Sequence, residues 1–257
     1  MNEIELGKSL SKKAGKIILK HFGTNFVTKT KSDFTPVTIV DEKINALVIS
    51  EVEKYFPEHN IIAEEGSVNK GSDYSWVCDP LDGTIPFAAG IPMSTFSLAL
   101  THKGKSILGF VNEPFTKRVF FAQEEKGTFF NKKQVFVNEN NTLDRANIGY
   151  CYWKINNSKH DFQKLIINLL DNGVRAFSVP SVVYMGASVA TGGLSGLFFP
   201  GTSPWDIAAL DILIKEAGGT TSDLFGENQK LDSTTKGFIG SNKNLYKELL
   251  KIAKRSI

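Results

Sequence analysis

A short apolar run that ends in two aspartates constrains the fold of this chain more than any other feature of its sequence. Residues 76–84 read Trp-Val-Cys-Asp-Pro-Leu-Asp-Gly-Thr, so an apolar segment leads directly to Asp79 and Asp82. The run Ser75–Cys78 is typical of a buried strand. A strand of this kind holds the side chains at its end in a fixed place. The chain must therefore build a core around this strand and still accommodate two negative charges beside it.

The residues that follow favour an anion beside the two acids. Gly83 and Thr84 lie at an apparent junction between a loop and a helix. The first N–H groups of a helix lack partners within it, and its positive dipole end attracts phosphate. Mg²⁺ takes carboxylate oxygens in octahedral geometry. The segment thus predicts a site for Mg²⁺ and phosphate; an Asx turn with a capping aspartate is the alternative that needs no ligand.

Two further acidic segments indicate a metal site only when they are considered together with the paired aspartates. Glu64 follows the apolar run Ile61–Ala63, and alone it would be explained by a solvated acidic loop. Asp206 follows Ser203, a natural N-cap, and Pro204, which suits the first helical position. An acid in the first turn of a helix is favourable without any metal, because it faces the positive end of the helix dipole.

The first half of the chain predicts an α+β lobe over residues 1–146. Apolar residues recur at helical spacing over 4–22 and again over 38–56, so Asp41 is expected in the first turn of the second helix. The β-prone segments from Phe96 to Phe130 are separated by turn-like residues and suggest an antiparallel meander.

The second half predicts an α/β lobe over residues 147–257, because strands and helices alternate there. Helices are expected over 161–170, near Tyr184–Ala190 and from Trp205 to Ala217. No repeat or long linker separates the halves, so we expect one body with a ligand cleft between its lobes.

Charge and cysteine content exclude several classes of protein. The 30 basic and 27 acidic residues leave a formal charge of only +3, which gives no footprint for nucleic acid or a membrane surface. Two cysteines without a CxxC spacing support neither a disulfide framework nor a thiolate metal site. The first residues lack the apolar block of a signal peptide, and no run approaches the ~20 apolar residues that span a bilayer. We expect a cytoplasmic protein.

The ordered motifs together resemble the inositol monophosphatase family. They are residues 36–41 (Pro-Val-Thr-Ile-Val-Asp), 63–66 (Ala-Glu-Glu-Gly), 76–87 around the paired aspartates, and 205–209 (Trp-Asp-Ile-Ala-Ala) with 216–219 (Glu-Ala-Gly-Gly). The resemblance implies a layered αβαβα sandwich, a homodimer, and a magnesium-dependent, lithium-sensitive phosphatase acting on a small phosphomonoester. The same superfamily includes fructose bisphosphatases, adenosine bisphosphate nucleotidases and histidinol phosphatases. A non-catalytic regulatory or binding protein on this fold is the alternative of a different class.

The resemblance also implies the roles of individual residues. The positions that match metal ligands for two or three Mg²⁺ ions are Glu64, Asp79, the carbonyl of Leu81, Asp82 and Asp206. Asp41 matches the acid near a third, weaker metal position. Thr84 matches the threonine that orients the attacking water together with Glu64 or Asp41, and Gly83 and Thr84 would offer N–H groups to the phosphate. Carboxylates that converge in this way repel each other, so bound cations would make the cluster tenable.

The side of the site that would hold the leaving group departs from the family pattern. Phe199 stands where inositol monophosphatases carry a glutamate that binds the polyol hydroxyls, and Ser181 follows a proline where a Gly-Ser pair commonly faces substrate. We predict substrate contacts at Ser181 and Phe199. An apolar ring cannot replace a polar contact, so this departure counts against inositol phosphate as the main substrate but not against phosphate cleavage.

Overall fold

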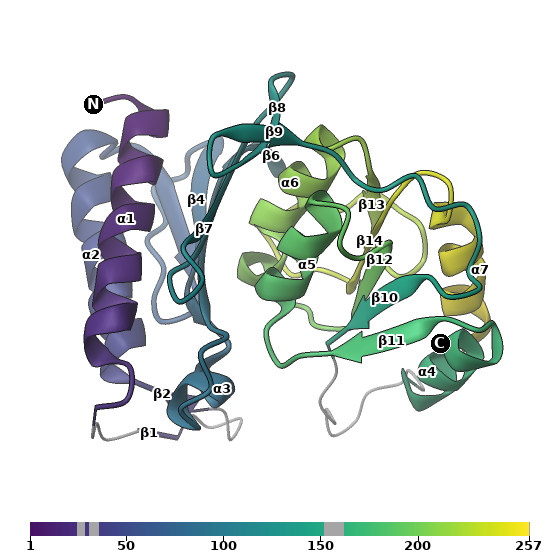
Figure 1. Ribbon diagram of the computed structural model, residues 1–257. Helices are drawn as coiled ribbons and strands as arrows, with labels where there is room; N and C mark the ends of the chain where they lie inside the picture. The colour runs from purple at the N-terminus through teal and green to yellow at the C-terminus, as the bar shows by residue number, and fades with distance from the viewer. Residues whose placement is uncertain (25–28, 31–35, 152–161, 257) are drawn as a thin grey trace.

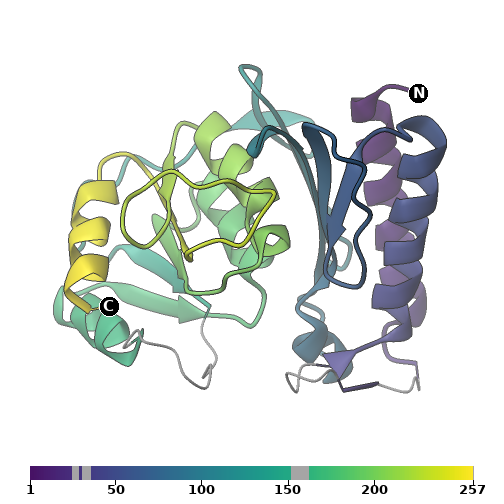
Figure 2. The ribbon, with the colours of Figure 1, turned by 180° about the vertical axis from the view of Figure 1, so that it is seen from behind.

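The computed structural model describes residues 1–24, 29–30, 36–151 and 162–256. Its two larger β-sheets alternate with layers of helices (Figure 1). The outer layer on the N-terminal side contains α1 (Glu3–His21) and α2 (Ile39–Tyr55), the layer between the sheets contains α5 (Val182–Ala190) and α6 (Ala208–Glu216), and the outer layer on the C-terminal side contains α4 (Phe162–Asp171) and α7 (Tyr246–Ser256). Figure 2 shows the same order of layers from behind. The predicted αβαβα sandwich is therefore confirmed.

The larger sheet has seven strands in the order β3-β4-β5-β6-β7-β8-β9. Their bounds are Asn60–Ala63, Tyr74–Asp82, Thr95–His102, Lys105–Glu113, Arg118–Gln123, Gly127–Phe130 and Lys133–Val135. Strand β3 pairs parallel to β4, and every later pair is antiparallel, which confirms the predicted meander. Strand β4 continues through both aspartates instead of ending at Cys78, as the apolar run alone had suggested.

The smaller sheet has five strands in the order β11-β10-β12-β14-β13. Their bounds are β10 Asn147–Tyr150, β11 Arg175–Ser178, β12 Gly196–Phe199, β13 Thr220–Ser222 and β14 Phe238–Ser241. Strand β10 pairs parallel to both of its neighbours, whereas β14 pairs antiparallel to β12 and β13. Short elements complete the chain: β1 (Lys29–Thr30), β2 (Pro36–Val37), α3 (Thr84–Ala88) and the 3-10 helix η1 (Pro204–Asp206).

The helix predicted from Trp205 to Ala217 is divided in two. Asp206 lies in η1, and α6 begins only at Ala208. Ser203 occupies the N-cap position of η1, with Pro204 as its first residue, as predicted, but the Ser203 side chain makes no capping hydrogen bond. The break separates Asp206 from the α-helix that follows. The helix predicted over 161–170 is observed as α4, which spans Phe162–Asp171. Residue 161 lies outside the described residues. No helix in the described parts of the chain combines the length and apolar character needed to cross a bilayer.

Helix α6 joins the larger sheet to the rest of the molecule through buried hydrogen bonds. The Ser106 hydroxyl on β6 donates to the carbonyl of Ala208 over 2.8 Å, and the Thr128 hydroxyl on β8 donates to the carbonyl of Leu213 over 2.6 Å. Between them Gly109 lets the helix approach closely, because a Cβ there would lie 2.6 Å from Ile212 and 3.1 Å from the backbone oxygen of Ala209. The sheet therefore fixes the helix that follows Asp206.

Gly109→Ala should lower the free energy of unfolding by about 1–3 kcal/mol, because the added methyl group overpacks the contact between β6 and α6. The midpoint of urea denaturation measures this loss. Gly193→Ala is the matched control, since a Cβ at Gly193 meets nothing closer than 3.4 Å. Equal midpoints for the two variants would contradict the close packing of α6 on the sheet.

Candidate metal centre

A β-bulge turns Asp79 and Asp82 toward the same side of the larger sheet. Asp79 lies opposite Ser97 on β5, but Asp82 lies opposite Thr95, so three steps along β4 match two steps along β5. Residues three apart on a regular strand point to opposite faces, and one extra residue restores them to the same face. Pro80 lies within the bulge and has no N–H for the ladder. The Leu81 N–H instead donates to Asp79 Oδ1 over 3.0 Å.

Asp206 completes a cluster of three carboxylates. One oxygen each from Asp79, Asp82 and Asp206 lies within 4.8 Å of the other two. Asp79 and Asp82 are buried, whereas Asp206 is half-buried, so solvent reaches the cluster at Asp206. The three oxygens are close enough to bind one divalent cation, and a set of carboxylate oxygens suits hard cations.

The N-terminus of α5 holds Asp82 in place. The Ser181 hydroxyl and the Val183 N–H (3.0 Å) donate to its Oδ2, and the Val182 N–H donates to its Oδ1 over 3.3 Å. The Thr95 hydroxyl adds a fourth donor over 3.1 Å. Burial raises the pKa of Asp82 to about 6, although these hydrogen bonds oppose the shift by stabilising the charged form.

Asp79 is in the least favourable electrostatic position of the cluster. Its burial raises its pKa well above the usual range, and the charges of Glu64, Asp82 and Asp206 raise it further. Within the described residues, the Leu81 N–H is the one hydrogen-bond donor to the Asp79 carboxylate. A buried carboxylate among other acids must bind a proton or a cation, which makes a cation the natural partner of the ionised cluster.

Asp41 and Thr84 lie beside the cluster and contact each other. The Thr84 hydroxyl donates to the carbonyl oxygen of Leu81 over 3.0 Å and lies 3.4 Å from Asp41 Oδ1. The other oxygen of Asp41 accepts from the N–H (2.8 Å) and hydroxyl (2.6 Å) of Thr38 in the capping box of α2. Burial raises the pKa of Asp41 to about 6, and the charges of Glu64 and Glu65 act in the same direction.

Glu64 lies near the cluster but outside its closest group. It follows β3, its N–H donates to the carbonyl of Cys78 over 3.4 Å, and it is half-buried. The described carboxylates whose oxygens lie within 4.8 Å of one another do not include it. Gly83 precedes α3 with φ of 85°, a left-handed conformation that favours glycine.

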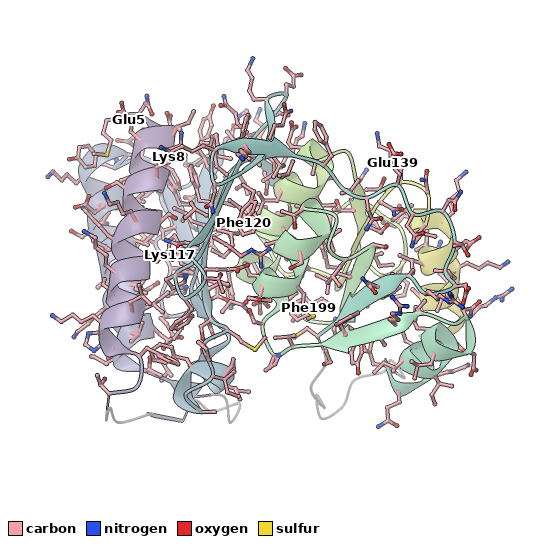
Figure 3. The ribbon with its side chains drawn as sticks, in the orientation of Figure 1. Glu5, Lys8, Lys117, Phe120, Glu139 and Phe199 are labelled. Carbon is pink, nitrogen blue, oxygen red and sulfur yellow. The ribbon has the colours of Figure 1, made fainter. Side chains whose placement is uncertain are left out.

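Two residues predicted to contact substrate are located differently from expectation. Ser181 is 1% exposed and contacts Asp82, so its hydroxyl supports a candidate ligand rather than lining an open pocket. The sequence signal that could have revealed this is a serine directly before an apolar helix, which is typical of an N-cap. Phe199, labelled in Figure 3, has no exposed surface. The ring packs in the core between the sheets, and the substrate contacts of Ser181 and Phe199 stay predictions.

Fold and centre together define a class of protein: a five-layered αβαβα sandwich with a carboxylate cluster where the larger sheet meets the middle helices. The model of the inositol monophosphatase family matches residues 2–257. The chain therefore belongs to the inositol monophosphatase family, which confirms the resemblance of its motifs.

Individual relatives agree with this assignment. A Thermotoga maritima protein named fructose-1,6-bisphosphatase/inositol-1-monophosphatase is 32% identical over 254 residues, covering 98% of this chain and 96% of the relative. The putative Nus factor SuhB of Neisseria meningitidis is 32% identical over 253 residues, covering 94% of each chain. The solved structure of a Thermotoga maritima IMPase has 31% identity and a TM-score of 0.89, covering 99% of this chain and 98% of that one.

If the cluster holds a divalent cation, Ser181→Ala should weaken that binding about 10- to 100-fold, the usual effect of removing a residue that orients a ligand. The variant loses the hydroxyl that donates to Asp82. Isothermal titration with Mg²⁺ measures the change in affinity. Ser188→Ala is the control on the same helix, because the Ser188 hydroxyl donates to the carbonyl of Tyr184 instead. Unchanged affinity in Ser181→Ala would contradict the positioning role.

The cation-free protein should lose stability as the pH rises from about 4 to above 6. The folded-state pKa values of Asp41 and Asp82, about 6 each, exceed the unfolded value of about 4. The folded state therefore binds more protons in this window, and the stabilising contribution present at low pH is lost as the pH rises through about 6. Thermal unfolding in the presence of chelator measures this slope.

Two comparisons test whether the carboxylate cluster causes this dependence of stability on pH. Asp79→Asn should flatten it, because one buried negative charge is removed, whereas Glu113, with a pKa raised to about 7 by burial, contributes equally to both proteins. Added Mg²⁺ should raise the melting temperature more at pH 7.5 than at pH 5. Identical slopes in the two proteins would exclude the cluster as their origin.

Proposed function

We propose that this chain is a Mg²⁺-dependent phosphatase that hydrolyses a small phosphomonoester. The observation that supports this most directly is the convergence of Asp79, Asp82 and Asp206 from separate segments, with oxygens within 4.8 Å of one another. The donor set fits Mg²⁺, since it offers only hard oxygens and an unfavourable excess of negative charge that a cation would relieve.

In this proposal Glu64 and the carbonyl of Leu81 join the three aspartates in holding two or three ions. Bound Mg²⁺ would neutralise the phosphate charge, lower the pKa of a water molecule and stabilise the leaving oxygen. The carbonyl of Leu81 already accepts from the Thr84 hydroxyl. The half-buried Glu64 follows β3, the neighbour of β4, and its charge acts on Asp79.

Thr84 and Asp41 would guide the attacking water. The Thr84 hydroxyl can accept a hydrogen bond from that water while it donates to Leu81 or Asp41. Asp41, with a pKa of about 6, is suited to accept a proton near neutral pH, and Glu64 is the alternative acceptor. Gly83 and Thr84 offer backbone N–H groups to the phosphate.

The side of the site that would hold the leaving group differs from the family pattern. Because Phe199 stands at the family's polyol-binding position and is buried, we propose a substrate range that differs from that of a dedicated inositol monophosphatase. The name of the Thermotoga maritima relative joins fructose 1,6-bisphosphate and inositol 1-phosphate, which makes these the first substrates to test. Adenosine bisphosphate and histidinol phosphate are the other candidates within the superfamily. We also propose inhibition by lithium, a homodimer and a cytoplasmic location.

A non-catalytic regulatory or binding role is the second candidate, and the names of some relatives favour it. Proteins named Nus factor SuhB or putative Nus factor SuhB match 94% of this chain at 32% identity in Neisseria meningitidis and 93% at 30% in Pasteurella multocida. Such a role would need no turnover, so measuring phosphate release separates it from the first candidate.

Asp79→Asn should reduce Mg²⁺-dependent phosphate release at least about 100-fold, because it removes a carboxylate from the centre of the cluster. Release of inorganic phosphate is measured for the four candidate substrates, with and without Mg²⁺. Circular dichroism confirms that the variant is folded. Asp73→Asn is the matched control, since Asp73 is exposed and pairs with Lys103 on the surface.

Two outcomes would contradict the proposal. Full activity in Asp79→Asn would remove the cluster from the reaction. Absence of phosphate release from every substrate by the wild-type protein, with Mg²⁺ binding intact, would favour the binding role instead.

A further inference from the structure

An open cavity of about 910 Å³ lies on the outer side of the larger sheet, away from the carboxylate cluster. Helix α1 forms one wall, and residues of β6, β7, β8 and their connecting turns form the floor and the other wall. Helices α5 and α6 pack on the opposite face of the same sheet, as the order of layers in Figures 1 and 2 shows. The cavity and the proposed active site are therefore on different faces of the sheet.

The floor of the cavity is aromatic. The ring centroids of Phe110 and Phe121 are 5.3 Å apart, and those of Phe121 and Phe129 are 6.3 Å apart. Alternation along β7 turns Phe121 to this side. Phe120 also borders the cavity, but its side chain is buried in the core between the sheets. Two further apolar side chains at the cavity are exposed, Leu19 at 50% and Val119 at 42%. Exposed apolar side chains grouped in this way are typical of a surface that binds a ligand or a partner.

The rim of the cavity is cationic. Five lysines line it: Lys8, Lys12 and Lys16 on α1, Lys117 in the turn after β6, and Lys132 in the turn after β8. The three on α1 are four residues apart and so form one stripe, about 12 Å long. The Lys8 ammonium lies 4.5 Å from the centroid of the Phe121 ring. Figure 3 labels Lys8 and Lys117, both on the side of the larger sheet that α1 covers.

No acid balances these lysines among the described residues that line the cavity. Glu5 is one turn before Lys8 on α1, but its carboxylate accepts from the Asn2 N–H over 3.0 Å in the capping box of that helix. Glu113, at the end of β6, is buried and pairs with Arg118 over 3.1 Å. The cavity thus combines an apolar floor with uncompensated positive charge.

We propose that this cavity binds a small amphiphilic organic anion, with an aryl or short acyl body on the phenylalanine rings and a carboxylate, sulfonate or phosphate group among the lysines. The volume lies within the range of about 300–1,000 Å³ that is typical of small-molecule sites. The rings contribute burial of the apolar body, and the lysines attract and orient the charged end. Neither half of the ligand alone would use both features.

The shape and charge disfavour larger occupants. A second copy of the chain, docked symmetrically through this face, would bring the two sets of lysines against each other. A flat bilayer would meet the lysines on the rim before its acyl chains reached the rings. A single-stranded nucleic acid could stack on aromatic rings beside cations, so it is included in the test.

The test is fluorescence titration of the full chain with 8-anilinonaphthalene-1-sulfonate, followed by competition. Decanoate should displace this probe at least about 10-fold more effectively than decanol, because only decanoate is charged, and inorganic phosphate should not displace it because it lacks an apolar body. Such selectivity requires both features of the cavity.

Variants locate the site. Lys12→Glu/Lys16→Glu should weaken binding at least about 10-fold, whereas Lys251→Glu/Lys254→Glu, with the same change in charge on exposed positions of α7, should leave it within about 2-fold. Leu19→Ser should also weaken binding, in contrast to Leu170→Ser, which removes a similarly exposed leucine (52%) from α4. All six positions are exposed, so the folds should persist, and thermal unfolding checks this.

Equal effects of the two lysine pairs, or equal displacement by decanol and decanoate, would overturn the proposal. Tighter binding of a single-stranded RNA oligonucleotide or of anionic vesicles than of the probe, lost in Lys12→Glu/Lys16→Glu, would replace the small anion by that partner. Concentration-dependent dimerisation abolished by the same variant would assign the face to a second copy of the chain.

Discussion

The centre of this molecule depends on one extra residue in β4. Without the bulge between Asp79 and Asp82, the two carboxylates would point to opposite faces of the larger sheet and could not meet Asp206. The bulge is stabilised locally, since Pro80 needs no partner in the ladder and the Leu81 N–H finds one in Asp79. The bulge brings carboxylates together in a buried place, where ionised groups are disfavoured. Hydrogen-bond donors at the N-terminus of α5 stabilise the charge of Asp82, and we propose that bound cations stabilise the cluster as a whole.

Much of this arrangement could be predicted from the sequence, because it depends on local patterns. The apolar run before Asp79, the stripes of α1 and α2 and the meander of β5 to β8 are periodic features of short segments. The family motifs added the order of the acids along the chain. They could not place Glu64 relative to the cluster, because that depends on side-chain distances across two strands.

The parts that the sequence could not predict involve contacts between distant segments. Ser181 carried an N-cap signal, yet the donation of its hydroxyl to Asp82 follows from the packing of α5 against the end of β4. Phe199 matches the family's polyol-binding position, and its complete burial in the core between the sheets could not be read from that match. The break before α6 likewise reflects the position of Asp206 beside β4, which outweighs the helical pattern of residues 205–217.

The two hydrogen bonds from Ser106 and Thr128 to carbonyls of α6 have a mechanical consequence. They link the middle helix layer to strands at both the centre and the far side of the larger sheet, with the Gly109 contact between them. A hinge motion that separated α6 from the larger sheet would break both buried hydrogen bonds and also open the close packing of α6 on Gly109. Helix α6 and the larger sheet therefore move as one unit, which keeps Asp79, Asp82 and Asp206 in fixed positions relative to one another.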